Sequence, residues 1–487
     1  MSAHSFDLSA AAFTEMVRQG FHPDLPTGSE EQVERIRAAK HETPGGEVRD
    51  LRGLLWSSID NDTSRDLDQV EFAERVDGGI RVRVGVADVS GSVAKNTPLD
   101  KHAADQTKTV YTATRNFPML PNELSTDMTS LNEGEDRAAV VSEFVVDPNG
   151  CLSQQKIYRA VVHNRAKLAY SKVGPWLEGK AEPDEKVAAS PELQAQLRLQ
   201  DEAARAIREE RVAQGALEFN RIEADPVVID GVVRAIKTAQ HNRATDLIED
   251  FMIGANETMA ELLRAAGRSS IRRVVRSPER WDRIVALVGR YGTELPAEPD
   301  SAALNAFLRK ERAADAVHYP DLSLSIIKLM GPGEYVLSKG SDTEPLGHFG
   351  LAARDYTHST APNRRFADLV IQRLVKAMLD DEPAPYTDAE LAAIAMQCNL
   401  KEKAGHKVER AMRKRVAAVA LANSIGKSFR GVITGASEKG VYVRVFDPPV
   451  EGRIVKGEHG LDVGDTVTVT LLHTDPQHAF IDFGHAG

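Results

Sequence analysis

Four carboxylates lie within nine residues of this chain, at Asp60, Asp62, Asp66 and Asp68. Carboxylates this close repel one another and raise one another's pKa values, so the arrangement is favourable mainly around a bound cation. Ligands that are all oxygen favour Mg²⁺, Mn²⁺ or Ca²⁺ over softer metals. The stretch is therefore a candidate site for divalent-metal chemistry, and an acidic loop that is merely hydrated is the alternative.

A calcium-binding EF-hand loop is a second alternative. The ligand positions of that template would be filled by Asp60, Asp62, Ser64, Asp66, Asp68 and Glu71. The template requires Gly at its sixth position, where this chain has Arg65, and helices on both sides. The flanks do not have a helical pattern, since residues 79–86 alternate with the period of a strand. These mismatches favour a different kind of oxygen-ligand site.

A second stretch that could do chemistry contains two adjacent arginines, Arg364 and Arg365. Pro362 suits the first turn of a helix, whose apolar face would be Phe366, Leu369, Val370 and Leu374. Cations are unfavourable at a helix start, so stability does not explain the arginines. A phosphate would, because free backbone N–H groups and guanidinium groups both bind oxyanions. The alternative is that each arginine pairs with a neighbouring carboxylate.

Together these motifs resemble the catalytic RNB domain of the ribonuclease II and RNase R family. The resemblance rests on the three aspartates Asp60, Asp66 and Asp68, on Ala-Asp-Val-Ser at 87–90, on Pro-Met-Leu-Pro at 118–121, and on 360–366, which is similar to the family's Thr-Ser-Pro-Ile-Arg-Arg-Tyr signature. It covers about residues 49–487. The chain departs from the signature at Ala361, Asn363 and Phe366, and Gln69 stands where the family has a fourth Asp.

The resemblance implies a 3′-to-5′ exoribonuclease that hydrolyses RNA to nucleoside 5′-monophosphates, with Mg²⁺ as cofactor and Mn²⁺ as a possible substitute. It implies that Asp60, Asp66 and Asp68 bind the metal and are catalytic, and that Arg364 is a catalytic phosphate clamp. Its substrate would be single-stranded RNA, or structured RNA with a 3′ overhang. The alternatives are a catalytically silent RNA-binding protein, which Gln69 alone supports, and an endoribonuclease.

Residues implied to contact RNA come from several segments. Tyr111 falls on the tyrosine that stacks against the terminal nucleotide, with an ordinary core aromatic as the alternative. Arg364 and Arg365 are the arginines of the signature. Glu409 lies among seven Lys and Arg side chains between 401 and 415. The corresponding helix of the family lines the RNA channel, although such a run is usually a solvated helix face.

The pattern of the whole chain predicts an α+β protein in three parts: an N-terminal helical domain over 1–48, the RNB catalytic domain over 49–427, and a five-stranded OB barrel over 428–487. Expected strands are 80–89, 138–146 and 155–163, and expected helical stretches are 184–214, 244–266, 279–291 and 301–315. The barrel resembles the ribosomal protein S-one type. Its Tyr442 is a candidate base-stacking residue, or else a core residue.

Residues 6–40 predict two helices, the second opening at Ser29, which form either a helix-turn-helix or winged-helix unit or a packing arm. The segment 1–48 is too short for the two cold-shock barrels that usually precede the RNB domain. Because no motif residue lies in 1–45, we expect a chain without these residues to keep digesting unstructured RNA.

Composition restricts where RNA could bind. The 487 residues carry a net charge of −11, so RNA binding requires a local basic channel. The two cysteines, Cys151 and Cys398, lie far apart without metal-ligand spacing, which fits a reducing compartment. Neither a leader nor a membrane-spanning run is evident, so we expect a cytoplasmic monomer without a membrane partner.

Overall fold

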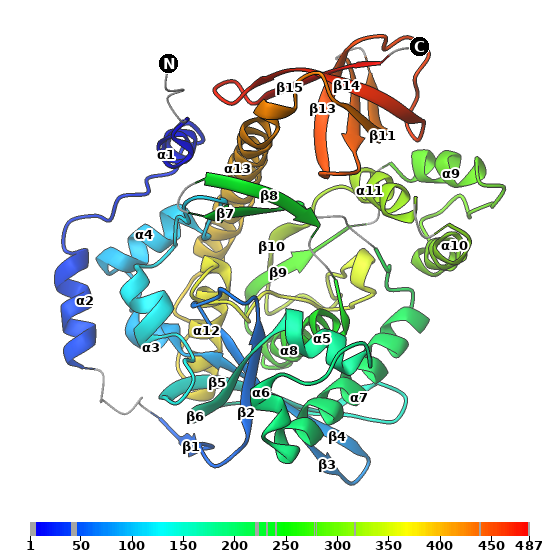
Figure 1. Ribbon diagram of the computed structural model, residues 1–487. Coiled ribbons are helices and arrows are strands. Elements are labelled where there is room, and N and C mark those ends of the chain that lie inside the picture. The colour runs from blue at the N-terminus through cyan, green and yellow to red at the C-terminus, as the bar shows by residue number, and fades with distance from the viewer. Residues whose placement is uncertain are drawn as a thin grey trace.

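The computed structural model describes residues 6–39, 46–219, 224–229, 232–238, 241–276, 278, 280–315, 318–437 and 440–485. A long helix, α13 (Asp388–Leu421), runs from the catalytic part of the molecule to a C-terminal barrel (Figure 1). It begins with a capping box, in which Thr387 and Glu390 each bind the other's backbone N–H. The mixed helix and strand content confirms the predicted α+β class.

A curled sheet forms the base of the catalytic part and follows the order β1-β6-β2-β3-β4-β5, with β5 also paired to β6. Its strands are β1 (Val48–Asp50), β2 (Trp56–Asp60), β3 (Gln69–Val76), β4 (Gly79–Ala87), β5 (Asp136–Val146) and β6 (Leu152–Ala169). The alternation that predicted β4 has a structural reason: Ile80, Val82, Val84 and Val86 share one buried face. Beyond β4, Asp88 caps the short helix α3 (Val89–Ser92), which ends the strand.

Helices cover both faces of this sheet. They are α3, α4 (Pro98–Gln106), η1 (Leu124–Met128), α5 (Tyr170–Leu177), α6 (Glu185–Ala188), α7 (Pro191–Ala213), α8 (Arg243–Ala265) and α12 (Phe366–Leu379). One apolar cluster joins the sheet to α12 and another joins it to α7 and α8. The stretch predicted as helical over 184–214 is two helices, because Ser190 caps α7 and Pro191 occupies its first turn.

Smaller elements surround this core. They are the strand pairs β7 (Ala224–Ile229) with β8 (Val232–Thr238) and β9 (Ser270–Val274) with β10 (Glu334–Ser338), the helices α9 (Trp281–Gly289), α10 (Ser301–Ala314) and α11 (Tyr319–Met330), and the short turns η2 (Phe349–Leu351) and η3 (Ala422–Ser424). Helices α9, α10 and α11 share a small core of their own.

The C-terminal segment is a closed barrel in the order β11-β12-β13-β15-β14, which confirms the predicted five-stranded barrel. Its strands are β11 (Ser428–Ser437), β12 (Gly440–Val445), β13 (Val450–Lys456), β14 (Thr466–Asp475) and β15 (Phe480–His485). Val443, Val469 and Phe483 are fully buried in its core, which also includes the end of α13. The barrel is therefore packed onto the catalytic part through this helix.

The N-terminal segment contains α1 (Leu8–Arg18) and α2 (Ser29–Ala38), so α2 opens at Ser29 as predicted. Among residues 6–39 there is no strand that could form a wing. Helix α1 lies beside α13, and α2 lies beside α4 (Figure 1). This is the geometry of a packing arm. Among the described residues, no helix has the length and apolar character needed to cross a membrane.

Candidate active site

The acidic loop joins two neighbouring strands of the sheet, β2 and β3. Asp60, the last residue of β2, accepts bonds on Oδ1 from its neighbour's backbone, Asn61 N–H (2.7 Å), and from Ser64 Oγ–H (2.9 Å). Because strands flank the loop on both sides, the helix-loop-helix of an EF-hand is excluded.

Asp68, at the end of this loop, is fully buried and meets the arginine motif. Arg364 Nε donates to its Oδ2 at 2.5 Å, and the backbone N–H of Asn363 donates to its Oδ1 at 3.0 Å. Burial raises the pKa of Asp68 to about 6, although Arg364 and the Asn363 N–H oppose this. The two motifs, almost 300 residues apart in the chain, thus form one site.

The arginine motif is a turn that precedes α12. Pro362 was predicted in the first turn of a helix, but α12 begins only at Phe366 and Arg365 is its N-cap residue. The reason is Asp368: its Oδ1 accepts the backbone N–H of Ala361 at 2.8 Å, which holds the preceding residues in a turn. Arg365 also pairs with Asp368, through Nε at 2.8 Å and a terminal nitrogen at 2.6 Å.

Tyr111 stands on a short hairpin that is hydrogen-bonded to the arginine turn. The backbone N–H of Thr109 donates to the carbonyl of Arg364 at 2.8 Å, and Lys108 forms an antiparallel bridge with Arg365. The Tyr111 hydroxyl donates to Asp66 Oδ2 at 2.7 Å. With 41% of its surface exposed, Tyr111 is not a core aromatic.

Tyr111, Arg364 and Arg365 line a pocket of about 220 Å³. Its walls are Thr107, Lys108, Thr109, Tyr111, Tyr335, Ala361, Arg364, Arg365, Ala367, Cys398 and Glu402. The motifs pointed to only three of these side chains. Lys108, Tyr335 and Glu402 were missed, because each is supplied by a different segment. The one signal for Lys108 was its place just before Tyr111 in the sequence.

The other two side chains predicted to contact RNA lie outside this pocket. Glu409 of α13 lies behind Lys108, whose Nζ is 3.1 Å from its Oε1, and also contacts His406 at 3.2 Å. Tyr442 belongs to the barrel strand β12, where Lys414 Nζ lies 5.8 Å from its ring centre. Glu409 is therefore an indirect neighbour of the pocket, and Tyr442 belongs to a separate surface.

Glu71 is a further acidic group beside the site. It is fully buried in β3, and among the described residues neither of its carboxylate oxygens has a hydrogen-bond partner. Burial, and then the charge of Asp60, raise its pKa well above the usual value. Gln69, two residues earlier on the same strand, shares its face and is 5% exposed. Ionised carboxylates in this region are therefore unfavourable unless a positive charge compensates them.

Arg364 provides part of that compensation. Burial opposes its charge, but Asp68, Tyr111, Asp60 and Asp66 together raise its pKa well above the usual value. Its Nε is the atom bonded to Asp68, and no described hydrogen bond engages its two terminal nitrogens. Those nitrogens are therefore available to an anion.

The donors of the acidic loop suit a hard divalent cation. Among the described residues, hydrogen bonds engage only Oδ1 of Asp60 and only Oδ2 of Asp66, which leaves one carboxylate oxygen on each as a ligand. Their ligand atoms and those of Asp68 are not all within 4.8 Å of one another. Since ligands of Mg²⁺ lie about 2.1 Å from the ion, coordination by all three requires side-chain rotation.

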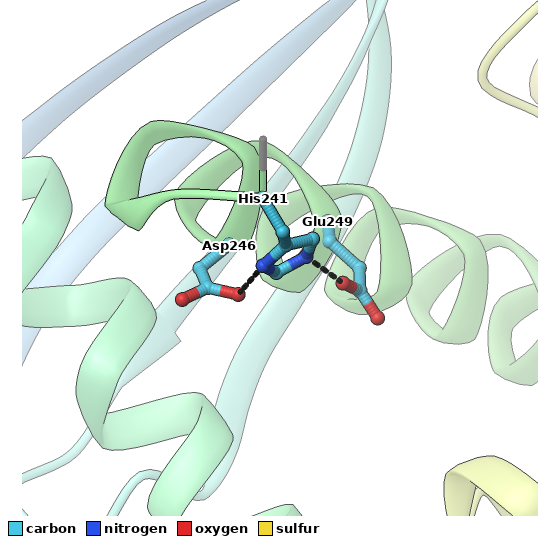
Figure 2. Close-up of side chains that lie close together, drawn as sticks. All are labelled: His241, Asp246 and Glu249. Carbon is cyan, nitrogen blue, oxygen red and sulfur yellow. Dashed lines mark ion pairs between the residues drawn. The ribbon is translucent and has the colours of Figure 1, made fainter. Parts of the chain in front are cut away.

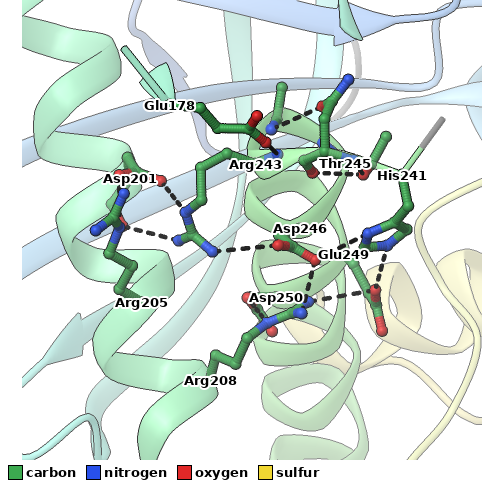
Figure 3. A network of polar contacts seen from close by, with 12 residues as sticks. Glu178, Asp201, Arg205, Arg208, His241, Arg243, Thr245, Asp246, Glu249 and Asp250 are labelled. Atoms are coloured by element: carbon green, nitrogen blue, oxygen red, sulfur yellow. Dashed lines mark hydrogen bonds and ion pairs between the residues drawn. The ribbon is translucent and has the colours of Figure 1, made fainter. Parts of the chain in front are cut away.

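One group that does meet this distance limit is His241, Asp246 and Glu249, at the start of α8 (Figure 2). The His241 ring nitrogens lie 3.5 Å from Asp246 and 3.9 Å from Glu249. Figure 3 shows why this group needs no metal: Arg208 of α7 reaches Asp246 at 2.6 Å and Glu249 at 3.3 Å. The cluster is an ion-pair network that ties α7 to α8.

A larger cavity of about 1130 Å³ is lined by Asn61 and Tyr170 near the acidic loop and shares Glu402 with the smaller pocket. The basic side chains on its wall are Arg273, Arg276, Arg280, Lys328 and Lys403, against the acidic side chains Glu249, Glu334 and Glu402. The cavity wall is basic although the whole chain carries a net charge of −11. A local basic surface of this kind is what a nucleic-acid ligand would require on a chain of this net charge.

Known proteins share this architecture. The ribonuclease R of Mycoplasma genitalium, solved in complex with ribose-methylated single-stranded RNA, superposes with a TM-score of 0.87 at 24% identity, covering 99% of this chain and 78% of that one. The yeast pseudonuclease Ssd1 superposes with a TM-score of 0.70 at 16% identity, covering 92% of this chain and 56% of that one. At these identities the likeness concerns the fold.

Sequence comparisons identify the family. Ribonuclease R of Escherichia coli is 30% identical over 451 residues, but the chain spans only 54% of that relative's length. Ribonuclease R of Aquifex aeolicus is 30% identical over 494 residues, covering 94% of this chain and 68% of the relative. The model of the RNB domain matches residues 48–381, and that of the RNase II-type exonuclease C-terminal S1 domain matches 427–486. The chain therefore belongs to the RNB family of ribonucleases.

Proposed function

We propose that this protein is a Mg²⁺-dependent exoribonuclease that hydrolyses RNA from the 3′ end and releases nucleoside 5′-monophosphates. One observation carries the proposal: Arg364, which is paired with the buried Asp68, and the exposed Tyr111 line a single pocket of about 220 Å³. An exonuclease needs this combination, since it must hold a terminal base and the adjacent phosphate together.

Arg364 and Tyr111 have distinct roles in this proposal. Because Asp68 holds Nε of Arg364, the guanidinium has a fixed orientation and its terminal nitrogens can clamp the oxygens of the scissile phosphate. The Tyr111 ring, oriented by its bond to Asp66, can stack against any terminal base. Stacking does not select a sequence, as expected for a degradative enzyme.

The metal would be held by Asp60, Asp66 and Asp68, with Mn²⁺ as an alternative ion. When bound, a divalent cation supplies charge that lowers the pKa of an attacking water and stabilises the pentacovalent phosphate. The chain's own contribution is to hold Arg364 against Asp68 and to exclude bulk water by burial of Asp68. Glu71 stays outside this set, since burial favours its neutral form.

RNA would reach the pocket through the basic cavity beside it. Single-stranded RNA is the proposed substrate, and structured RNA with a 3′ overhang is a further candidate, because structures of the Mycoplasma genitalium relative contain single-stranded and double-stranded RNA. Arg365 and Glu409 would act close to the strand, and Tyr442 would contact it on the barrel. We further propose a cytoplasmic monomer divided at about residues 48 and 427.

Digestion of end-labelled RNA tests this function. With a 5′ label, an exonuclease yields a ladder that shortens from the 3′ end, and with a 3′ label it yields a labelled mononucleotide at once. An endoribonuclease yields labelled oligonucleotides of intermediate length with either label. A catalytically silent RNA-binding protein yields no product but retains the RNA on a filter. Any outcome other than mononucleotide release refutes the proposal.

A further inference from the structure

The N-terminal arm packs against the hairpin that carries Tyr111. Leu8, Ala12 and Met16 of α1, followed by Phe21, are buried in one cluster with Val110 and Phe117, and the same cluster includes Val408, Met412 and Val416 of α13. Val110 and Phe117 pair with each other across the hairpin through two backbone hydrogen bonds. The N-terminal arm, residues 6–22, therefore provides the apolar surface against which the hairpin packs.

Charged groups fix the arm in this place. Glu15 of α1 is 1% exposed and lies 3.4 Å from Arg415 of α13, while it also binds Arg18. Lys401 of α13 donates to the carbonyl of Gly20 at 2.7 Å, and its ammonium lies 4.8 Å from the ring centre of Phe21. The family resemblance placed Lys401 on a helix that lines the RNA channel, but it is 8% exposed and contacts the arm.

Arg115, near the tip of the hairpin, links the two elements directly. Its guanidinium lies 5.4 Å from the ring centre of Phe13 on α1 and 5.0 Å from that of Phe117 on the hairpin. Both distances are those of cation–π contacts. Tyr111 lies between Val110 and this tip, so its backbone is held from below by the arm.

The opposite edge of the same hairpin is hydrogen-bonded to the arginine turn and to the acidic loop. Thr109 donates to the carbonyl of Arg364, and Tyr111 donates to Asp66. We propose that residues 6–22 are a positioning brace, which holds the Tyr111 ring where a terminal base can stack on it. The proposal rests on the stacking function proposed above for Tyr111. It reverses the expectation that the arm is dispensable, because removal would expose Val110 and Phe117.

Affinity for two RNA oligonucleotides tests the brace. One ends in an ordinary 3′ nucleotide and the other in an abasic one, and binding is measured in EDTA so that neither is hydrolysed. The ratio of the two affinities reports stacking alone, because the phosphates are identical. Stacking on one aromatic ring corresponds to roughly a 5- to 150-fold preference for the base-bearing end.

Three variants in α1 are compared with wild type and with Tyr111→Ala. Met16→Ala removes a buried contact and Phe13→Leu removes the ring beside Arg115 while keeping apolar volume. Val17→Ala is the matched control, since Val17 is on the same helix but 52% exposed. If Met16→Ala does not fold, Phe13→Leu decides.

The expected result is that wild type and Val17→Ala prefer the base-bearing end, while the preference falls at least several-fold in Phe13→Leu and Met16→Ala and disappears in Tyr111→Ala. An unchanged ratio in both arm variants overturns the brace and leaves the function of Tyr111 intact. A wild type without any preference, or a Tyr111→Ala variant that keeps it, refutes the stacking function itself and the brace with it. The two failures are distinguishable. Failure of the brace changes the expected result only in the arm variants, whereas failure of the stacking function changes it in wild type or in Tyr111→Ala.

Discussion

Replacing Arg364 by Ala tests whether this side chain clamps the scissile phosphate, because the adjacent Arg365 provides a matched control. Arg364 pairs with Asp68 and Arg365 pairs with Asp368. Both aspartates are fully buried, and the side chains of the two arginines are 30% and 32% exposed. They differ in how many nitrogens the pairing uses. Asp68 engages Nε of Arg364 alone, whereas Asp368 engages Nε and one terminal nitrogen of Arg365.

The shared pairing predicts a similar loss of stability. Removing one partner of a buried ion pair costs about 3–5 kcal/mol of unfolding free energy, since a buried charge is left unpaired. We therefore expect Arg364→Ala and Arg365→Ala to lower the urea midpoint by comparable amounts. The different use of the nitrogens predicts different kinetics. Loss of one preorganised transition-state contact costs about 10²–10³ in turnover, and we expect this fall for Arg364→Ala only.

The assay is hydrolysis of a short end-labelled RNA at saturating enzyme, combined with filter binding in EDTA and urea unfolding. Affinity should change little in Arg364→Ala, because the basic groups proposed to hold the strand line the larger cavity and remain in place. A fall in turnover that is equal in both variants would show that the loss reflects stability rather than chemistry. A loss of affinity with unchanged turnover would make Arg364 a residue that only positions RNA.

The remaining predictions concern the acidic loop and one partly buried carboxyl. Asp68→Asn should abolish hydrolysis while RNA affinity in EDTA stays near that of wild type, and appreciable turnover would contradict its role as a metal ligand. Gln69→Asp should lower the Mg²⁺ concentration for half-maximal turnover, because hard cations gain affinity with ligand charge, and an unmoved midpoint would place residue 69 out of contact with the ion. Burial, together with Glu261 and Asp355, raises the pKa of Glu257 to about 7 from an ordinary value of 4.5. Its stabilising contribution is therefore complete below pH 4.5 and lost as the pH rises through 7, at no more than about 1.4 kcal/mol per pH unit. Glu257→Gln should flatten the dependence of the urea midpoint on pH in this window, and an unchanged slope would count against the shift.

Sequence was informative where a single segment carries the chemistry. The four carboxylates of the acidic loop could be recognised because their mutual repulsion is a local property. Glu71 shows the limit of this reasoning. By spacing it is the last ligand of a calcium loop, yet β3 directs it into the protein interior, where neither oxygen has a partner among the described residues. The strand assignment, together with Arg65 at the Gly position of the calcium-loop template, separates these two interpretations.

Spacing was least informative where the walls of the pocket come from distant segments. Lys108 forms a backbone bridge with Arg365, and the Tyr335 hydroxyl shares a hydrogen bond of 2.8 Å with His358. Glu402 forms an ion pair with Arg273 of the larger cavity. None of these contacts leaves a periodic pattern, because each joins residues that follow different local rules. The same holds for the start of α12, where Asp368 stabilises the turn before the helix and places Arg364 outside it.

The hairpin around Tyr111 explains why such distant segments can act as one site. One of its edges is bonded to the arginine turn, its tip contacts α1, and its tyrosine reaches the acidic loop. A displacement of this short element would move a candidate stacking ring and the backbone of Arg364, the proposed phosphate clamp, together. Its position should therefore be more sensitive to core substitutions than that of the acidic loop, which is anchored at both ends by sheet strands.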